Sequence, residues 1–239
     1  MTVSHCGSVS ALSLGLPAST AIPEQKGPLP KALFVAKAPV SAKLKQRLVN
    51  DIASITMLAL ARPANTGLEA GTRVPEVLVI GLRLTPKATD VPVEVIDLIA
   101  GQRKSGIVFV CVRETPFEGS TREECAFAVR RALPGRAGHT PVHQVYASAW
   151  RPAGEAQLEL SGASIDDLWA SMCSQTILGT TDHADLDARL IRHGQIARLQ
   201  AEVDKLTRDH QRAKNPAQRN EIYAKLHKAK TQLAALRAE

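Results

Sequence analysis

The sequence predicts a mixed α/β protein in which a sheet flanked by helices is followed by a C-terminal antiparallel helical hairpin, or coiled coil. Two continuous apolar runs, at 77–84 and 107–112, are typical of strands that are covered on both faces. A narrow apolar seam with steps of three and four residues begins after about Asp185 and continues to the end of the chain. Such a seam keeps one side of an α-helix against a partner, so it predicts a coiled coil and not a globular core.

These patterns divide the chain into three parts. Residues 1–28 are rich in Ser, Gly, Ala and Pro, and we expect them to form a flexible N-terminal arm. Residues 29–180 are expected to form the α/β globular domain, and residues 183–239 the hairpin. Because the aromatic content is only 3%, the core must be built from Val, Leu, Ile and Ala.

The globular domain is expected to begin with a helix that Ser41 caps and that runs to about Leu60. A strand over 74–84 follows. Proline in the first turn and glycine after the last predict a helix over 92–101. A second strand over 107–112 completes a strand–helix–strand order, which indicates a crossover connection and a parallel pair of strands.

The second half of this domain has shorter apolar runs separated by Gly and Pro. Three of them, at 125–130, 142–150 and 157–160, are expected to add antiparallel strands at the edge of the sheet. Ser164 with Asp167 three residues later has the pattern of a capping box, so it predicts the start of a helix.

The hairpin has two seams, one on each side of the break at Asn215-Pro216. This break is short enough for two helices to fold back on each other, so the seam can be buried within the chain or against another chain. The seam positions are Ile196, Leu199, Val203, Leu206, His210, Ala213, Ile222, Leu226, Ala229, Leu233 and Leu236.

The formal net charge of +7 permits contact with nucleic-acid phosphates but does not require it. In the hairpin, twelve basic and seven acidic side chains are interspersed, which is the pattern of a solvated coiled-coil surface. One cluster could contact phosphate, and it consists of Lys225, Lys228 and Lys230 with Arg219 upstream.

No catalytic or cofactor-binding motif is found in the sequence. It has no phosphate-binding loop, no dinucleotide-binding glycine motif, no zinc-protease motif and no nucleophile elbow. No C-x-x-C pair occurs, so Cys111 and Cys173 are expected to be buried free thiols in a reducing compartment. No apolar stretch approaches the length of a membrane span. The sequence therefore predicts a cytoplasmic protein without metal or cofactor, and it favours a non-enzymatic role.

One enzymatic alternative stays open. The order of helices and strands also suits a restriction-type nuclease, whose site holds magnesium between an acidic residue and a Glu-x-Lys on adjacent strands. Glu76, Asp97 and Glu114 are the carboxylates that would have to converge. Because the strand has Gly81 and Arg83 where an acid and a lysine would be needed, we interpret Glu76 as an edge carboxylate and Arg83 as a solvated strand end.

A family resemblance is carried by Leu29-Pro30-Lys31 with Phe34, by 49–56, by 77–84 and by 220–226. These segments are similar to a bacterial and archaeal family catalogued as domain of unknown function 4391, and the resemblance covers nearly the whole chain after about residue 12. It brings no assigned activity. It implies a gene that lies beside DNA methyltransferases and superfamily-two helicases in restriction-modification or phage-defence clusters.

We therefore expect an accessory subunit of a bacterial DNA restriction or phage-defence system. Its hairpin would dock a helicase or a DNA methyltransferase, or a second copy of the chain. A divergent metal-dependent nuclease and a nucleic-acid-binding protein remain the alternatives. The side chains expected to contact the partner are Arg208, Arg212, Arg219, Tyr223, Lys225, Lys228 and Lys230.

Overall fold

The computed structural model describes residues 2–36, 39–133 and 141–238. Its contacts divide the chain into two compact units, Met1–Ala184 and Asp185–Glu239. The first is called the globular unit below, and the second is the hairpin. The hairpin begins two residues after the position expected from the sequence.

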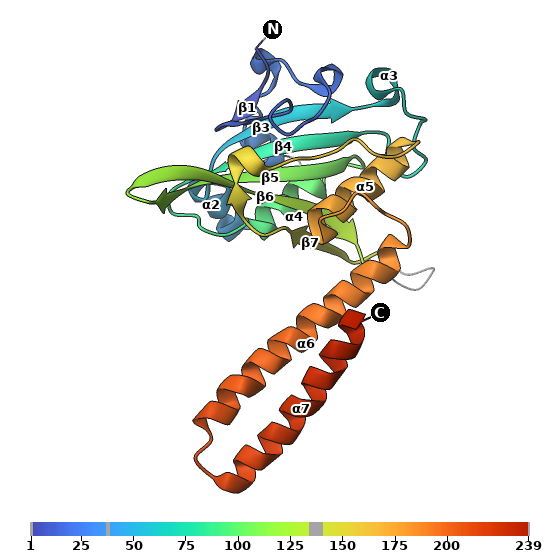
Figure 1. Cartoon of the computed structure of the whole chain (residues 1–239). Coiled ribbons are helices and arrows are strands. Elements are labelled where there is room, and N and C mark those ends of the chain that lie inside the picture. The colour runs from blue at the N-terminus through green and yellow to red at the C-terminus, as the bar shows by residue number, and fades with distance from the viewer. Residues whose placement is uncertain (1, 37–38, 134–140, 239) are drawn as a thin grey trace. The chain divides into compact units, whose positions relative to one another are not determined.

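A six-stranded mixed sheet forms the centre of the globular unit (Figure 1). β4 and β5 are parallel, and each of the other paired strands is antiparallel to its neighbour. The predicted α/β class is therefore confirmed. The strands are, in spatial order, β3 (Ile52–Ala61), β4 (Val77–Leu84), β5 (Gly106–Phe117), β6 (Ser120–Ala132) and β7 (His143–Ala147), and β8 (Arg151–Pro152) pairs with another part of β6.

Two helices cover one face of this sheet. α4 (Val93–Ala100) connects β4 to β5 where the sequence predicts a crossover helix, and α2 (Ala42–Asn50) packs beside it. Alternate residues of the two parallel strands, such as Ile80 and Phe109, point into the same apolar cluster as these helices. Because both faces are covered, β4 and β5 lack the alternation of polar and apolar residues that a half-exposed strand would have.

The predicted long helix over 41–60 is wrong in its second half. Ser41 does cap α2 by accepting a hydrogen bond from the Leu44 N–H, but α2 ends at Asn50 and the chain continues as β3. The pairing of β3 with β4 is shifted between Ile52 and Ser54, so Ile52 and Ile55 are both buried although they are three residues apart. An irregular strand of this kind imitates the three-and-four spacing of a helix.

The N-terminal segment is not a flexible arm. Residues 1–28 contain β1 (His5–Cys6), β2 (Val9–Ser10) and two 3-10 turns at Ala18–Thr20 and Glu24–Lys26, and the short helix α1 (Ala32–Val35) follows them. Its small residues permit close packing against the sheet, which the composition does not reveal. A Cβ atom at Gly81 of β4 would lie 2.4 Å from the Cys6 Cβ, so only glycine leaves room for β1.

The same segment lies along the outer edge of β3. The Ile22 N–H donates to the Leu58 carbonyl at 3.0 Å, and the Leu29 N–H donates to the Ile55 carbonyl at 2.8 Å. In the opposite direction, the Met57 N–H donates to the Gly27 carbonyl at 2.8 Å. Backbone groups that would otherwise be unpaired at a sheet edge are therefore bonded within the chain.

The expected strand over 157–160 is also absent. Its backbone bonds to a side chain instead: the Glu159 N–H donates to the Gln175 Oε1, and the Gln175 Nε2 donates to the Glu159 carbonyl, both at 2.9 Å. A glutamine amide thus supplies the donor and acceptor that a neighbouring strand would supply. The other two expected edge strands are present, within β6 and as β7.

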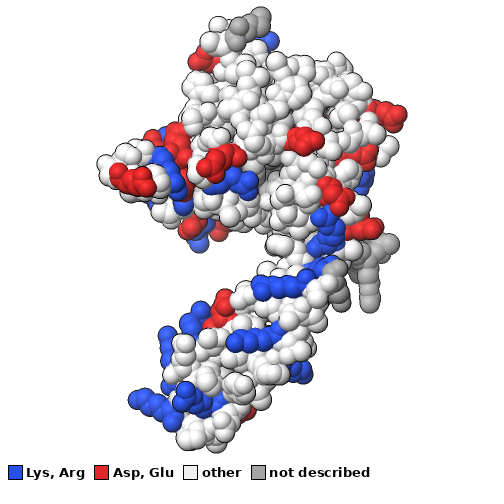
Figure 2. All heavy atoms as spheres, in the orientation of Figure 1, with Lys and Arg blue, Asp and Glu red and all other residues white. Residues whose placement is uncertain are grey.

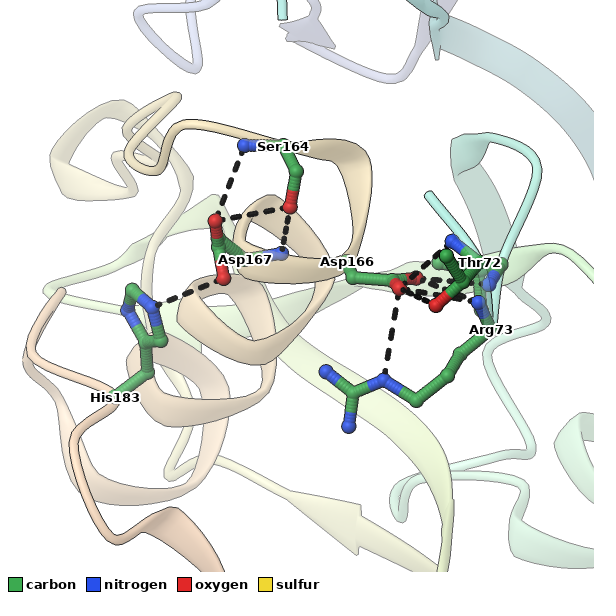
Figure 3. A network of polar contacts seen from close by, with 7 residues as sticks. Thr72, Arg73, Ser164, Asp166, Asp167 and His183 are labelled. Atoms are coloured by element: carbon green, nitrogen blue, oxygen red, sulfur yellow. Dashed lines mark hydrogen bonds and ion pairs between the residues drawn. The ribbon is translucent and has the colours of Figure 1, made fainter. Parts of the chain in front are cut away.

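α5 (Ile165–Leu178) packs on the face of the sheet opposite α2 and α4, where its Trp169 lies against Gly106. The predicted capping box is confirmed, because the Ser164 and Asp167 side chains each bond to the other residue's backbone N–H. The residue before Asp167 is Asp166, whose carboxylate accepts hydrogen bonds from the loop before β4 (Figure 3).

The hairpin consists of α6 (Leu186–Arg212) and α7 (Pro216–Ala238). The turn between them is fixed by Asn215, whose Oδ1 accepts a hydrogen bond from the Ala217 N–H at 2.8 Å. At the other end of the hairpin, the Arg192 Nε donates to the Leu236 carbonyl in the last turn of α7. A cation is favourable there because the carbonyls of a helix C-terminus carry partial negative charge.

Candidate functional site

The seam of the hairpin is buried between its own two helices. Val203, Leu226, Ala229 and Leu233 are each at most 7% exposed, and partly buried Ile196, Leu199 and Leu206 pack against them. The predicted seam is therefore confirmed as an internal core. It follows that a partner would contact the surface that the paired helices leave exposed.

Positive charge is concentrated at the turn end of the hairpin. Residues 205–230, called the distal end below, contain eight basic and two acidic side chains, whereas the rest of the hairpin contains four basic and five acidic ones. Figure 2 shows Lys and Arg side chains on the visible face of the hairpin. Acidic and basic side chains are interspersed in both parts, but the excess of positive charge is confined to the distal end.

All seven predicted partner-binding residues are exposed on the distal end, but they do not form one cluster. At 100° per residue, Arg219, Tyr223 and Lys230 lie within about 40° of one another on α7. Lys228 points about 180° away from Arg219, and Lys225 lies on the other side of the seam. The remaining two, on the outer side of α6, are Arg208 and Arg212.

Local contacts distinguish these side chains further. The Lys225 ammonium is 2.7 Å from the Glu221 carboxylate, and this contact holds the pKa of Glu221 below its usual range. The Tyr223 ring is 57% exposed and lies 5.8 Å from the His210 ring, across the seam. Sequence reasoning missed Lys205 and Lys214 as members of the distal end. A charge count over short windows, instead of over the whole hairpin, would have found them.

The nearly neutral end of the hairpin has a different surface. A groove of about 510 Å³ lies between α6 and α7 there, and Leu199, Ala235 and Leu236 contribute its apolar lining. Ile191, one turn before the groove, is 49% exposed. The other groove residues are Gln195, Arg198 and Gln232.

The three carboxylates of the nuclease alternative do not converge. Glu76 lies beside Gly106 at the start of β5, because the Gly106 N–H bonds to the Glu76 carbonyl at 3.0 Å. Glu114 is eight residues further along β5, a distance of about 26 Å at ~3.3 Å per residue. Each carboxylate also has its own arginine: Arg62 binds Glu76, Arg130 binds Asp97, and Arg83 binds Glu114. These three carboxylates therefore do not form the magnesium-binding arrangement that the nuclease alternative requires.

Arg83 is not a solvated strand end. Its side chain is 21% exposed, and its guanidinium forms ion pairs with both Glu114 and Glu123, which are cross-strand neighbours on β5 and β6. Although burial opposes it, hydrogen bonds from Ser8 and Arg83 hold the pKa of Glu123 below its usual range. Arg83 thus neutralises two carboxylates that would otherwise repel each other.

Three of the four thiols of the globular unit are not suited to nucleophilic chemistry. Cys6, Cys111, Cys125 and Cys173 are buried and none of them forms a disulfide, as expected for Cys111 and Cys173. Burial raises the pKa of Cys6 to about 12 and that of Cys125 to about 11, and it also raises the pKa of Cys111 strongly. These three therefore stay protonated at neutral pH, whereas the thiolate is the reactive form.

Metal and membrane sites are also absent from the part of the chain that the structure describes. Within it, no group of three or more His, Cys, Asp or Glu side chains could hold a metal ion. Each helix found there is too short or too polar to cross a bilayer.

Comparison with known proteins gives one match. Residues 14–233 match the model of a family described as Domain of unknown function (DUF4391). No curated protein and no solved structure matches the chain. Because the match covers most of the sequence, the chain belongs to the DUF4391 family.

Proposed function

We propose that this chain is a non-enzymatic accessory subunit of a bacterial DNA restriction or phage-defence system, and that its hairpin docks a helicase or a DNA methyltransferase. The observation that carries the proposal is that the hairpin is a separate compact unit whose seam is already buried. A helix pair that needs no partner to complete its core leaves its exposed surface available for binding. The dispersed carboxylates and protonated thiols of the globular unit fit a role without catalysis.

The docking surface for a protein is assigned to the nearly neutral end of the hairpin. Its groove has apolar side chains at the centre and glutamines and an arginine at the rim, which is the usual arrangement of a protein interface. The exposed Ile191 extends the apolar area. Because this end carries almost no net charge, a protein surface without strong charge can bind it without displacing anions that the distal end attracts.

Replacing Ala235 by arginine is expected to weaken docking at least tenfold, about 1.4 kcal/mol, because a long side chain would fill the groove. Ala235 is exposed and arginine is a good helix former, so the hairpin should stay folded. The measurement is co-purification of the full-length chain with the helicase or DNA methyltransferase proposed as its partner, followed by titration of the purified partner.

Ala224→Arg is the matched control, since it adds the same side chain to an exposed position of α7 outside the groove. It should retain the partner. Deletion of residues 185–239 should abolish co-purification. If the partner is still recovered in full after this deletion, the hairpin has no docking role.

A further inference from the structure

Seven of the eight basic side chains at the distal end have no partner. Of these eight, only Lys225 makes an ion pair within the described residues, with Glu221. The seven others are all exposed, and none of their side chains forms a hydrogen bond or ion pair in the described part of the chain. They are Lys205, Arg208, Arg212, Lys214, Arg219, Lys228 and Lys230.

These cations surround a short rod instead of forming a patch on one side. The basic stretch of α7, from 216 to 230, is about 21 Å long, and that of α6, from 205 to 212, is about 10 Å long. Because Arg219 and Lys228 project in opposite directions, a flat or globular ligand could not reach all the charges at once. A flexible anionic polymer that winds around the rod could, whereas a stiff duplex would contact the cations of one side.

Mutual repulsion makes this arrangement unfavourable in isolation. Two acidic side chains among eight basic ones leave an excess of six positive charges in 26 residues, and Glu221 is already paired. An anionic polymer would relieve the repulsion and release its own bound cations, which favours binding at low salt.

The chemistry of the exposed aromatic pair indicates which polymer fits. Tyr223 is 57% exposed and lies against His210, in the same row of α7 as Arg219 and Lys230. Exposed aromatic rings between phosphate-binding cations are typical of nucleic-acid surfaces, because bases can stack on them. The carboxylate side chains of an acidic protein segment, in contrast, have no ring that could stack on Tyr223. We propose that the distal end of the hairpin binds the phosphate backbone of a nucleic acid.

This inference goes beyond protein docking and can fail independently of it. The two activities lie at opposite ends of the hairpin, so one chain could hold a protein partner at its neutral end and a nucleic acid at its distal end.

The test is fluorescence anisotropy with the full-length chain and three labelled probes of arbitrary sequence: a 20-base-pair DNA duplex, a 20-nucleotide DNA strand and a 20-nucleotide RNA strand. Binding is expected at 50 mM KCl and should weaken steeply towards 200 mM. If four to seven cations contact phosphates, the slope of log K against log salt for the single strands should be about −3 to −5. Polyglutamate of similar charge should bind at least tenfold more weakly.

Triple substitution Arg212→Gln, Arg219→Gln and Lys230→Gln should weaken binding at least tenfold and reduce the slope by about 2 to 3. The matched control, Lys45→Gln, Lys87→Gln and Lys104→Gln, removes the same charge from exposed positions of the globular unit and should leave the slope unchanged. Circular dichroism must show that both variants keep their helices.

The variant Tyr223→Ala distinguishes stacking of unpaired bases from contact with phosphates alone. Weaker binding of single strands alone assigns a stacking site for unpaired bases, and unchanged binding of all three probes assigns contact through phosphates; both outcomes support the proposal. No binding at 50 mM KCl, equal losses in the two triple variants, or polyglutamate binding as tightly as DNA would each overturn it.

Discussion

Replacing Asp166 by alanine should lower the free energy of unfolding of the globular unit by about 3 kcal/mol at pH 7. The Asp166 carboxylate accepts hydrogen bonds from the backbone N–H groups of Thr72, Arg73 and Val74 at 2.8–3.1 Å, and one from the Thr72 hydroxyl at 2.9 Å (Figure 3). Alanine would remove all of these acceptors at once. Thermal or urea unfolding measures the loss, and Glu155→Ala, at an exposed site, should change stability by less than about 0.5 kcal/mol.

The same carboxylate should make stability depend on pH in the acid range. Burial raises the pKa of Asp166, but the hydrogen bonds from Val74, Arg73 and Thr72 outweigh it and hold the pKa far below the ordinary value of 3.8. Below pH 3.8, therefore, the Asp166 carboxylate is protonated in the unfolded chain but stays ionised in the folded chain, so stability falls as the pH falls. Asp166→Asn lacks this titration, and its deficit relative to the natural chain should shrink between pH 5 and pH 2. A constant deficit would contradict the assignment.

Leu226→Asp should unfold the hairpin and leave the globular unit intact. Leu226 is 7% exposed in the centre of the seam, where an unpaired carboxylate would cost several kcal/mol. A 55-residue unit has about 3–8 kcal/mol of stability in total, so most of it would be lost. α6 and α7 hold more than half of the α-helical residues described, and the helical signal in circular dichroism should fall accordingly.

Ala224→Asp provides the matched control, because it places the same side chain at an exposed position of α7, two residues away. Its helical signal should stay within a few per cent of that of the natural chain. The thermal transition of the globular unit should be the same in both variants. Full retention of helix in Leu226→Asp would mean that the seam does not hold the hairpin together.

The elements that sequence reasoning found are those whose pattern is complete within the element itself. The apolar runs of β4 and β5, the capping box of α5 and the seam of the hairpin each need no knowledge of a distant neighbour. The prediction of a helix in place of β3 was wrong because the buried positions of β3 depend on a shift in its pairing with β4. The prediction of a flexible N-terminal arm was wrong because the packing of β1 depends on Gly81, more than seventy residues away in the sequence.

The residues of the candidate site could be predicted from the sequence, but their positions relative to one another could not. The sequence identified the hairpin and most of its cations, since steps of three and four residues place side chains on a known helix face. It did not show that Arg83 bridges Glu114 and Glu123, because cross-strand neighbours are set by the register of β5 with β6. The pairing of β4 with β5, in turn, places Glu76 beside Gly106, eight residues before Glu114 on β5.

The bonding of the N-terminal segment to β3 bears on how the protein can be shortened. A truncated protein that begins at residue 29, which the composition of the first 28 residues invites, would lose the bonds that Ile22 and Gly27 make to β3. The carbonyl of Leu58 and the N–H of Met57 would then be unpaired on β3, at the open edge of the sheet. Such an edge is a template for pairing between molecules, so the shortened chain would be prone to aggregate.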